Sequence, residues 1–478
     1  MRTLLQVLSE EEQAQIHERT LTLLAKSGMR VDTSRGRHIL GESGAIINEH
    51  DAIVLFPPAV VETALQSAPR QFSLGGRRPN WGYQVNAGNC TLLADGEAIY
   101  MYDAKTGTRR VGTYDDWLHA TLLIDALDEV GLYWSMIRGW SDQDSPGDFV
   151  NYWCNIFRHF TKHVQDVVER PGQVRWLLEV LQVIIGGRET IRREKPVSLL
   201  LTPYSPRVIE EAFTTAYLET LGWDIPVAVM PMPMMGTTAP GSLISTLVLA
   251  NSEVLATLCF IQAAAPGTPF IYAPAPSIID PRTGRFGGGA IEHALLGAAV
   301  TEMGRYYGLP VLASTGGADH HIPDIQAGYE RGSNWALTTL SWPDILVGPG
   351  LLGGAMTLSL EQLLIDVEIF RRCKRLYQGI GSDEHQWLEN TITIVGPGGN
   401  FLAQPSTRKA VHSGEWYIDQ IGMHTSFEAW EGAGKPSMLD SLRDQIDKIL
   451  DSHTALPFGE DVERELEKIE QRAREEST

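Results

Sequence analysis

Apolar positions follow one pattern before about residue 130 and another after it. In the first part, Ser9 and Glu12 form a capping box that starts a helix with apolar positions at Ile16 and Leu24. In the second part, short β-type runs alternate with helical stretches, which is typical of repeated β–α units. We predict eight such strands, at 132–138, 163–168, 197–202, 226–231, 269–274, 310–315, 344–348 and 391–396.

Eight β–α units favour a closed (β/α)8 TIM barrel, with a doubly wound parallel sheet as the alternative. Before the barrel, residues 81–112 predict a β-meander in which Asp95-Gly96 is the hairpin turn between 91–93 and 98–100. After it, the charged stretch 461–476 predicts a surface helix. The expected α/β fold therefore has an N-terminal α+β extension (1–130), the barrel (131–400) and a C-terminal helical tail (401–478).

Charge and cysteine content narrow the possible functions. The 478 residues include 39 Lys and Arg against 59 Asp and Glu, which gives a formal net charge of −20. Most of such a surface would repel a phosphate backbone, so we expect no nucleic-acid partner. The four cysteines are far apart and form no CxxC motif, which disfavours a disulfide scaffold and a cysteine-rich zinc site. These residues, expected to be buried thiols, are Cys90, Cys154, Cys259 and Cys373.

The longest apolar stretch, Leu243–Ala265, bears on membrane association. It is interrupted by Asn251, Ser252 and Glu253, so it predicts a buried helix rather than a membrane span. The first residues lack a basic segment followed by a long apolar run, so we expect no signal peptide. A cytoplasmic protein without membrane contact is the resulting prediction.

Aromatic residues gather where the predicted strands end. Catalysis in a TIM barrel takes place at the C-terminal ends of its strands, and Trp140, Tyr204 and Tyr272 fall at or near those ends. A quaternary ammonium ion cannot donate hydrogen bonds, so a protein holds it against aromatic faces. These side chains are therefore candidates for a cation cage, with ordinary core packing as the alternative.

A polar loop follows the predicted strand at 310–315. It contains Asp319, His320 and His321, but adjacent histidines usually point apart and no third His or Cys lies nearby, so we expect no metal site. A histidine there can instead donate a hydrogen bond to a substrate carboxylate. The loop is therefore a candidate substrate contact.

Two further features follow the strand at 344–348. Gly348 and Gly350 lie in a glycine-rich loop and are candidate cofactor contacts. Glu361 is a candidate substrate-binding residue, and together with Asp366 it also allows a glycosidase interpretation. Nothing in the spacing of these two carboxylates favours that interpretation over others.

Short segments along nearly the whole chain resemble the trimethylamine methyltransferase superfamily of corrinoid-protein methyltransferases. The resemblance implies a TIM barrel that moves a methyl group from a methylamine to Co(I) of a separate corrinoid protein. The segments are Leu8-Ser9-Glu10 with Ile16-His17-Glu18, Asp103 with Thr106-Gly107, Gly236 to Pro240 with Asn251 and Glu253, Pro266 to Pro269, Gly308-Leu309-Pro310, Asp319 with Asp324 to Gly328, Glu361-Gln362-Leu363, and Val395 to Gly399.

One departure from the family pattern changes the expected substrate. The trimethylamine enzymes carry pyrrolysine near the segment that corresponds to Thr315–His321, whereas every residue here is a standard one. The chain thus resembles the non-pyrrolysine branch, which demethylates betaines. A quaternary ammonium already bears the charge that lets a neutral amine leave, so orientation is the main demand on the protein.

The resemblance therefore predicts an enzyme of one-carbon metabolism that demethylates a quaternary amine, with glycine betaine as the expected substrate. Its cobalamin is expected on the partner corrinoid protein, with no metal held by this chain, and the chain is expected to form a homo-oligomer. The alternatives are the same reaction on proline betaine, carnitine or butyrobetaine, a TIM-barrel glycosidase, and a non-catalytic betaine-binding protein.

Overall fold

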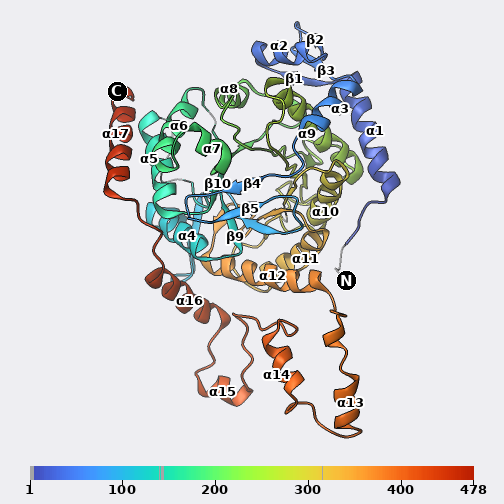
Figure 1. Ribbon diagram of the computed structural model, residues 1–478, viewed down its shortest axis with the longest axis vertical. Coiled ribbons are helices and arrows are strands. Elements are labelled where there is room, and N and C mark those ends of the chain that lie inside the picture. Colours follow the sequence, from blue (N-terminus) through green and yellow to red (C-terminus); the bar gives the residue numbers. More distant parts are fainter. Residues whose placement is uncertain (1–4, 139, 141–144, 169, 315, 478) are drawn as a thin grey trace.

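A closed parallel barrel forms the centre of the computed structural model, which describes residues 5–138, 140, 145–168, 170–314 and 316–477 (Figure 1). Eight parallel strands pair in one sheet, and a parallel bridge between Tyr272 and Val311 joins its two edge strands. The predicted (β/α)8 barrel is thereby confirmed. The strands are β6 (Thr91–Leu93), β9 (Val130–Tyr133), β10 (His163–Asp166), β11 (Val197–Leu201), β13 (Val227–Val229), β15 (Phe270–Tyr272), β17 (Leu312–Ser314) and β18 (Ile345–Val347).

Seven of these strands overlap predicted positions, and the eighth corrects two predictions. The strand expected at 391–396 is wrong, because Glu389–Val395 form helix α13, which has no buried residue. The prediction of a hairpin turn at Asp95-Gly96 is also wrong. Strand β6 is buried along its whole length and pairs in parallel with β9 and β18, as a central barrel strand does. The barrel thus takes its first strand from the segment assigned to the N-terminal extension, and the three-part division of the chain stays a prediction.

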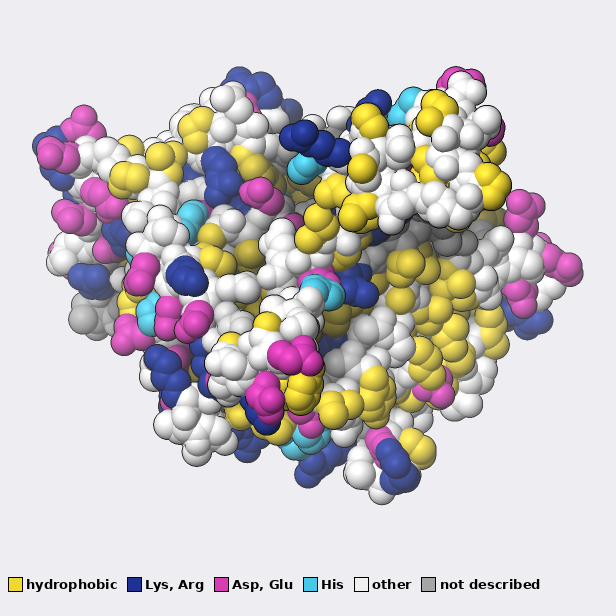
Figure 2. Space-filling view, turned by 90° about the horizontal axis from the view of Figure 1, so that it is seen from below, with side chains coloured by type: hydrophobic (Ala, Val, Ile, Leu, Met, Phe, Trp, Pro, Cys, Tyr) yellow, Lys and Arg dark blue, Asp and Glu magenta, His cyan; other side chains and the backbone are white. Residues whose placement is uncertain are grey.

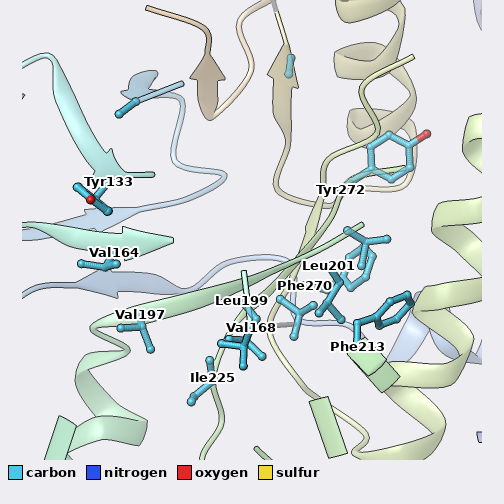
Figure 3. Packing of buried hydrophobic residues seen from close by; sticks show 14 of the residues in the cluster. Tyr133, Val164, Val168, Val197, Leu199, Leu201, Phe213, Ile225, Phe270 and Tyr272 are labelled. Carbon is cyan, nitrogen blue, oxygen red and sulfur yellow. The ribbon is translucent and has the colours of Figure 1, made fainter. Parts of the chain in front are cut away.

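Side chains of each strand alternate between the barrel interior and the surrounding helices. The interior cluster includes Leu93, Leu132 and Met230. Leu74 of β4 (Ser73–Gly75) and Val85, which directly follows β5 (Gly82–Gln84), belong to the same cluster. On the outside, Figure 3 shows Leu199, Leu201 and Phe270 in one layer with Phe213 of α8. The barrel is therefore a packed core, and only the C-terminal ends of its strands are open for chemistry.

Helices surround the strands in chain order. The apolar stretch predicted as a buried helix forms α9 (Leu243–Ala264), which is long and apolar enough to cross a membrane but is mostly buried in the protein. The other helices of the ring are α4 (Tyr114–Ala126), α5 (Pro146–His159), α6 (Gln173–Ile184), α7 (Arg188–Glu194), α8 (Glu211–Glu219), α10 (Ile291–Tyr306), α11 (Ile325–Ser341) and α12 (Leu360–Gln378).

The N-terminal extension is tied to the barrel through a small sheet. Strand β1 (Met29–Val31) pairs with β12 (Val208–Ile209), which follows barrel strand β11, and helices α1 and α3 pack on α9. A second small sheet includes β7 (Tyr100–Asp103) and β20 (Thr357–Leu358). The remaining elements are α1 (Glu10–Lys26), α2 (Ser34–Glu42), β2 (Ile46–Asn48), β3 (Ile53–Leu55), α3 (Pro58–Ser67), β8 (Thr108–Val111), β14 (Met234–Met235), β16 (Ser277–Ile278) and β19 (Leu351–Leu352).

The C-terminal tail returns to the barrel wall after a projecting segment. Helix α16 (Met438–Ser452) packs on α12 and α4, and the charged helix α17 (Glu460–Glu476), predicted from its sequence, packs on α5 and α6. Between α12 and α16, residues 379–437 extend away from the barrel and carry α13, α14 (Pro405–His412) and α15 (Phe427–Gly432) (Figure 1). We call residues 379–437 the arm.

Candidate active site at the barrel mouth

Three polar side chains come together at the mouth from neighbouring strands. Asp95, Trp134 and Gln165 lie two residues beyond interior positions of β6, β9 and β10, so alternation directs all three inward. Trp134 packs against the interior apolar cluster, and its ring lies so close to Gly96 that any larger residue there would clash with it. The mouth is therefore lined on this side by a carboxyl, an indole and an amide.

Two of these groups have buried donors without acceptors. The indole Nε1 of Trp134 and the amide Nε2 of Gln165 have no hydrogen-bond partner among the residues that the structure describes. Ser198 Oγ donates a hydrogen bond to Oε1 of Gln165 at 3.1 Å. This bond fixes the orientation of the amide, so that its nitrogen points away from Ser198. Because a buried donor without a partner costs about 1–3 kcal/mol, a ligand that accepts from these groups would be favoured.

The same side of the mouth is acidic. Asp95 stays partly accessible, but the protein around it desolvates its carboxyl and raises its pKa to about 6, while Arg331 acts in the opposite direction. Glu97 forms an ion pair with Arg138 at 2.8 Å. Burial and the charge of Glu97 raise the pKa of Asp166 to about 7, and Tyr152 donates a hydrogen bond to it at 2.6 Å. At neutral pH the ionised carboxyl of Asp95 therefore places a negative charge on this side of the mouth.

The predicted aromatic cage residues do not come together. Trp140 packs outside the strands against Trp117 and Tyr152, with ring centroids 4.6 Å and 5.6 Å away. Tyr204 is 61% exposed on the loop after β11, where its backbone pairs with Val208. Tyr272 is buried between β15 and the helices, and its hydroxyl donates to Asn251. Each ring thus lies in a different environment.

The predicted polar loop, by contrast, lies beside the loop after β18. The N–H of Gly353 donates to the carbonyl of His320 at 2.8 Å, and His321 lies against the same glycine. The ring of His320 lies 2.8 Å from Asp324. Asp319 has one buried carboxyl oxygen without a partner among the described residues. These side chains therefore form a second polar wall next to Gly353, in the loop after β18.

A buried ion pair holds these two loops in place. The guanidinium of Arg331 on α11 donates to the carbonyls of Gly316 and Leu351 and lies 3.4 Å from Asp366 on α12. Asp366 in turn accepts from the N–H of Gly350 at 2.7 Å. Both charged side chains are fully buried. Arg331 was not predicted, although an arginine on the buried face of an apolar helix is a signal that a sequence can give.

Glu361 and Gly350, two of the predicted site residues, both have structural contacts within the chain. Glu361 lies in the first turn of α12, accepts a hydrogen bond from Ser359 at 3.0 Å and lies 3.6 Å from Arg443 on α16. It therefore contacts the C-terminal tail, and it forms no carboxylate pair with Asp366, which is occupied by Arg331. At Gly350 a side chain would contact Met136 and two leucines, so close packing explains this glycine without a cofactor.

No group of three or more His, Cys, Asp or Glu suited to hold a metal ion occurs among the described residues. All four cysteines are buried, and burial raises the pKa of Cys373 to about 11. None of them is therefore an activated thiolate at neutral pH.

Comparisons with known proteins agree with this barrel. The family model described as trimethylamine methyltransferase (MTTB) matches residues 2–477. Trimethylamine methyltransferase MttB1 of Methanosarcina mazei is 29% identical over 98% of this chain and 95% of that protein. Glycine betaine methyltransferase of Desulfitobacterium hafniense is 28% identical over 89% of this chain and 88% of that protein.

A solved structure supports the fold. The monomethylamine methyltransferase (MtmB) of Methanosarcina barkeri superposes with a TM-score of 0.50 over 92% of each chain, at 10% sequence identity. The match of the family model over nearly the whole length identifies the chemistry as methyl transfer rather than glycoside hydrolysis. The chain belongs to the trimethylamine methyltransferase family.

Proposed function

We propose that the protein transfers a methyl group from a betaine, with glycine betaine as the expected substrate, to the reduced corrinoid of a separate protein. Family membership supports methyl transfer from an amine. The polar groups of the barrel mouth support a betaine as that amine. The observation that carries the proposal is the proximity of carboxylates to buried donors without partners at one mouth. A betaine is a zwitterion, and this arrangement offers opposite partners to its two ends.

The acidic side would hold the ammonium end. A trimethylammonium group offers no N–H, so Asp95 and Glu97 would attract it through charge alone. Trp134 has its ring against Gly96, between these two carboxylates in the sequence, and its indole N–H has no acceptor among the described residues. The substrate carboxylate would then accept from Trp134 and Gln165, which removes the cost of leaving these donors without partners.

The absence of pyrrolysine supports a quaternary rather than a tertiary amine. Breaking the C–N bond of a quaternary ammonium returns the electron pair to nitrogen and releases a neutral amine, so no residue has to protonate the leaving group. The partner's reduced corrinoid would supply the nucleophile. This chain would bind the substrate, direct one methyl group toward the open mouth and exclude water.

The second wall of the mouth has a supporting role in the proposal. Asp319, His320 and His321 lie beside the loop after β18 and could contact a longer substrate such as carnitine. We assign no residue of this chain as a corrinoid ligand, since close packing already explains Gly350. The cytoplasmic location expected from the sequence is part of the same proposal.

One assay tests the proposal. The protein is incubated without oxygen with Co(I) cobalamin and, in separate reactions, glycine betaine, proline betaine, carnitine, butyrobetaine and trimethylamine, and the Co(I) absorbance is followed. We expect loss of Co(I) with glycine betaine and little change with trimethylamine. Comparable rates with trimethylamine contradict the proposal, and binding of betaine without loss of Co(I) identifies a binding protein instead.

A further inference from the structure

A pocket between the N-terminal extension and the barrel has a basic lining. Its volume is about 870 Å³, and its walls are the second half of α1, the loop after β11, and the segment from β14 into α9. Arg19, Lys26 and Arg207 line this pocket, and no Asp or Glu is among the described residues that do. On the face shown in Figure 2, by contrast, Lys and Arg side chains lie interspersed with Asp and Glu. Three cations around one pocket, in a chain with a net charge of −20, therefore indicate a candidate anion site.

Two of the cations lie on one face of α1. Arg19 and Lys26 are seven residues apart, so they lie about 10.5 Å apart along the helix axis and point in nearly the same direction. Thr22 and Leu23, between them, line the same pocket. Neither cation forms an ion pair or a side-chain hydrogen bond within the described part of the chain. Both are therefore available to a ligand.

The third cation is positioned by a buried carboxylate. Arg207 has a left-handed backbone with a φ of 59°, which residues other than glycine rarely adopt. Its N–H donates to Oε1 of Glu253 at 2.8 Å, and the hydroxyl of Ser205 donates to Oε2 at 2.8 Å. The guanidinium donates through Nη1 to the carbonyl of Gly28 at 3.0 Å. Glu253 thus holds the backbone of this loop, and the guanidinium has no ion pair among the residues described.

Backbone hydrogen bonds join the walls of the pocket to one another. Strand β1, which follows α1, pairs in parallel with β12, and the N–H of Arg30 donates to the carbonyl of Arg207 at 3.0 Å. On the opposite wall, Oγ1 of Thr238 accepts from the N–H of Met234 at 2.8 Å, and its own proton has no acceptor among the described residues. The pocket is therefore formed before a ligand binds, which reduces the entropic cost of binding.

The lining limits the class of ligand. Three cations and a free hydroxyl proton supply charged and neutral donors for a group with two or more negative charges. The pocket also has an apolar surface, formed by Leu23, Val248 and Leu249, which suits a carbon skeleton or a ring. Its volume lies in the range of about 300–1,000 Å³ that is usual for small-molecule sites. An organic phosphate combines these properties.

We propose that this pocket binds an organic phosphate of the size of a nucleoside diphosphate, with Arg19, Lys26 and Arg207 around its phosphate groups. The lining contains none of the residues to which the proposed function assigns the methyl donor. Two of the walls follow barrel strands β11 and β13, so the ligand would lie beside the mouth and not in it. Binding there does not depend on the identity of the methyl donor, so it can be tested without methyl transfer.

Calorimetric titration of the full-length protein tests the site, with ADP, adenosine, inorganic phosphate and hexaglutamate as probes at one ionic strength. We expect ADP to bind one to one, at least about tenfold more tightly than each of the other three. Arg19→Gln/Lys26→Gln should weaken ADP binding by at least about tenfold. Arg35→Gln/Lys105→Gln is the matched control, because it removes two exposed cations that do not line the pocket, and it should keep the ADP affinity within about twofold.

Three results overturn the proposal. They are the absence of ADP binding, equal weakening in both double variants, and tighter binding of hexaglutamate than of ADP, which would assign the pocket to an acidic segment of a protein. Hydrogen exchange on the wild-type protein needs no variant. ADP should slow amide exchange in residues 19–27 and 237–240, and slowing only elsewhere would place ADP at another site and overturn the proposal as well.

Discussion

The two walls of the barrel mouth differ in how their buried polar groups are paired. On the side of β17 and β18, Arg331 and Asp366 form a buried ion pair and bind loop backbone, although Arg331 Nε and one oxygen of Asp319 have no hydrogen-bond partner among the described residues. On the side of β6, β9 and β10, Trp134 and Gln165 have buried donors without acceptors in the part of the chain that the structure describes, on the same side as a desolvated Asp95. The comparison separates groups that position the mouth from groups that are free to bind a ligand.

The largest effect is expected where the internal pairing is broken. Replacing Arg331 by Met leaves Asp366 buried without its counter-charge and releases the carbonyls of Gly316 and Leu351. Loss of one partner of a buried pair costs about 3–5 kcal/mol, and we expect the free energy of unfolding in urea to fall by that amount. Arg331→Met/Asp366→Leu should recover a large part of it, and a double variant no better than the single one would contradict the pairing.

The next effect concerns the charge on the ligand-binding wall. Because the pKa of Asp95 is raised to about 6, its carboxyl is mostly protonated below that pH and ionised above it. We expect the KM for glycine betaine to fall as the pH rises through about 6, and Asp95→Asn to raise the KM at pH 7.5 by about tenfold to a hundredfold. A pH profile of KM that keeps this step in Asp95→Asn would exclude Asp95 as its source.

A rise in pH acts through Asp95 in opposite directions on the stability of the fold and on betaine binding. A carboxyl with a raised pKa in the folded protein binds more protons there than in the unfolded chain, so its contribution to stability is lost as the pH rises from about 4 to 6. Asp95→Asn should therefore flatten this part of the unfolding profile while it weakens betaine binding. A variant that loses both stability and binding would place Asp95 among the positioning groups.

How much of this site could be predicted from the sequence differs between the two walls. The polar loop 319–321 could be found, because it follows a β-type run directly, and its neighbour after β18 could be found in the same way. Asp95 could not, because Asp-Gly between two short apolar runs is also the strongest signal for a hairpin. Only the parallel pairing of β6 shows that Asp95 ends a barrel strand.

The aromatic residues illustrate a second limit. The position of a ring near a strand end says nothing about its direction, and one residue of register decides between interior and helix layer. Trp134 lies inside, whereas Tyr133 beside it packs outward against Phe160. An error of one residue does not change the predicted fold class, because seven strands were enough to identify the barrel. The same error places a side chain on the wrong side of the strand, so it makes a predicted binding site wrong.

A smaller effect is expected from removing one donor. Trp134→Phe keeps an aromatic face and loses the indole N–H, so we expect the KM for glycine betaine to rise by about tenfold, equivalent to about 1.4 kcal/mol. Binding of tetramethylammonium, which has no carboxylate, should change little in the same variant. Trp153→Phe is the matched control, because its indole nitrogen also lacks a partner among the described residues but lies on α5, away from the mouth. Equal effects of both variants on KM would remove the donor role.

The smallest effects on binding are expected from the rings outside the interior, and they test the cation-cage interpretation directly. Trp140 packs against Trp117 and Tyr152, so Trp140→Leu should lower the melting temperature and leave the betaine affinity of the folded protein within about twofold. Tyr204 is mostly exposed, and a substitution at such a position usually changes stability by no more than about 0.5 kcal/mol. Calorimetric titration of Tyr204→Leu beside Tyr204→Phe then decides its role. Tenfold weaker betaine binding in the leucine variant alone would show that the loop after β11 brings this ring to the ammonium group. Equal affinities of the two variants would mean that the charges of Asp95 and Glu97 hold the cation without this ring.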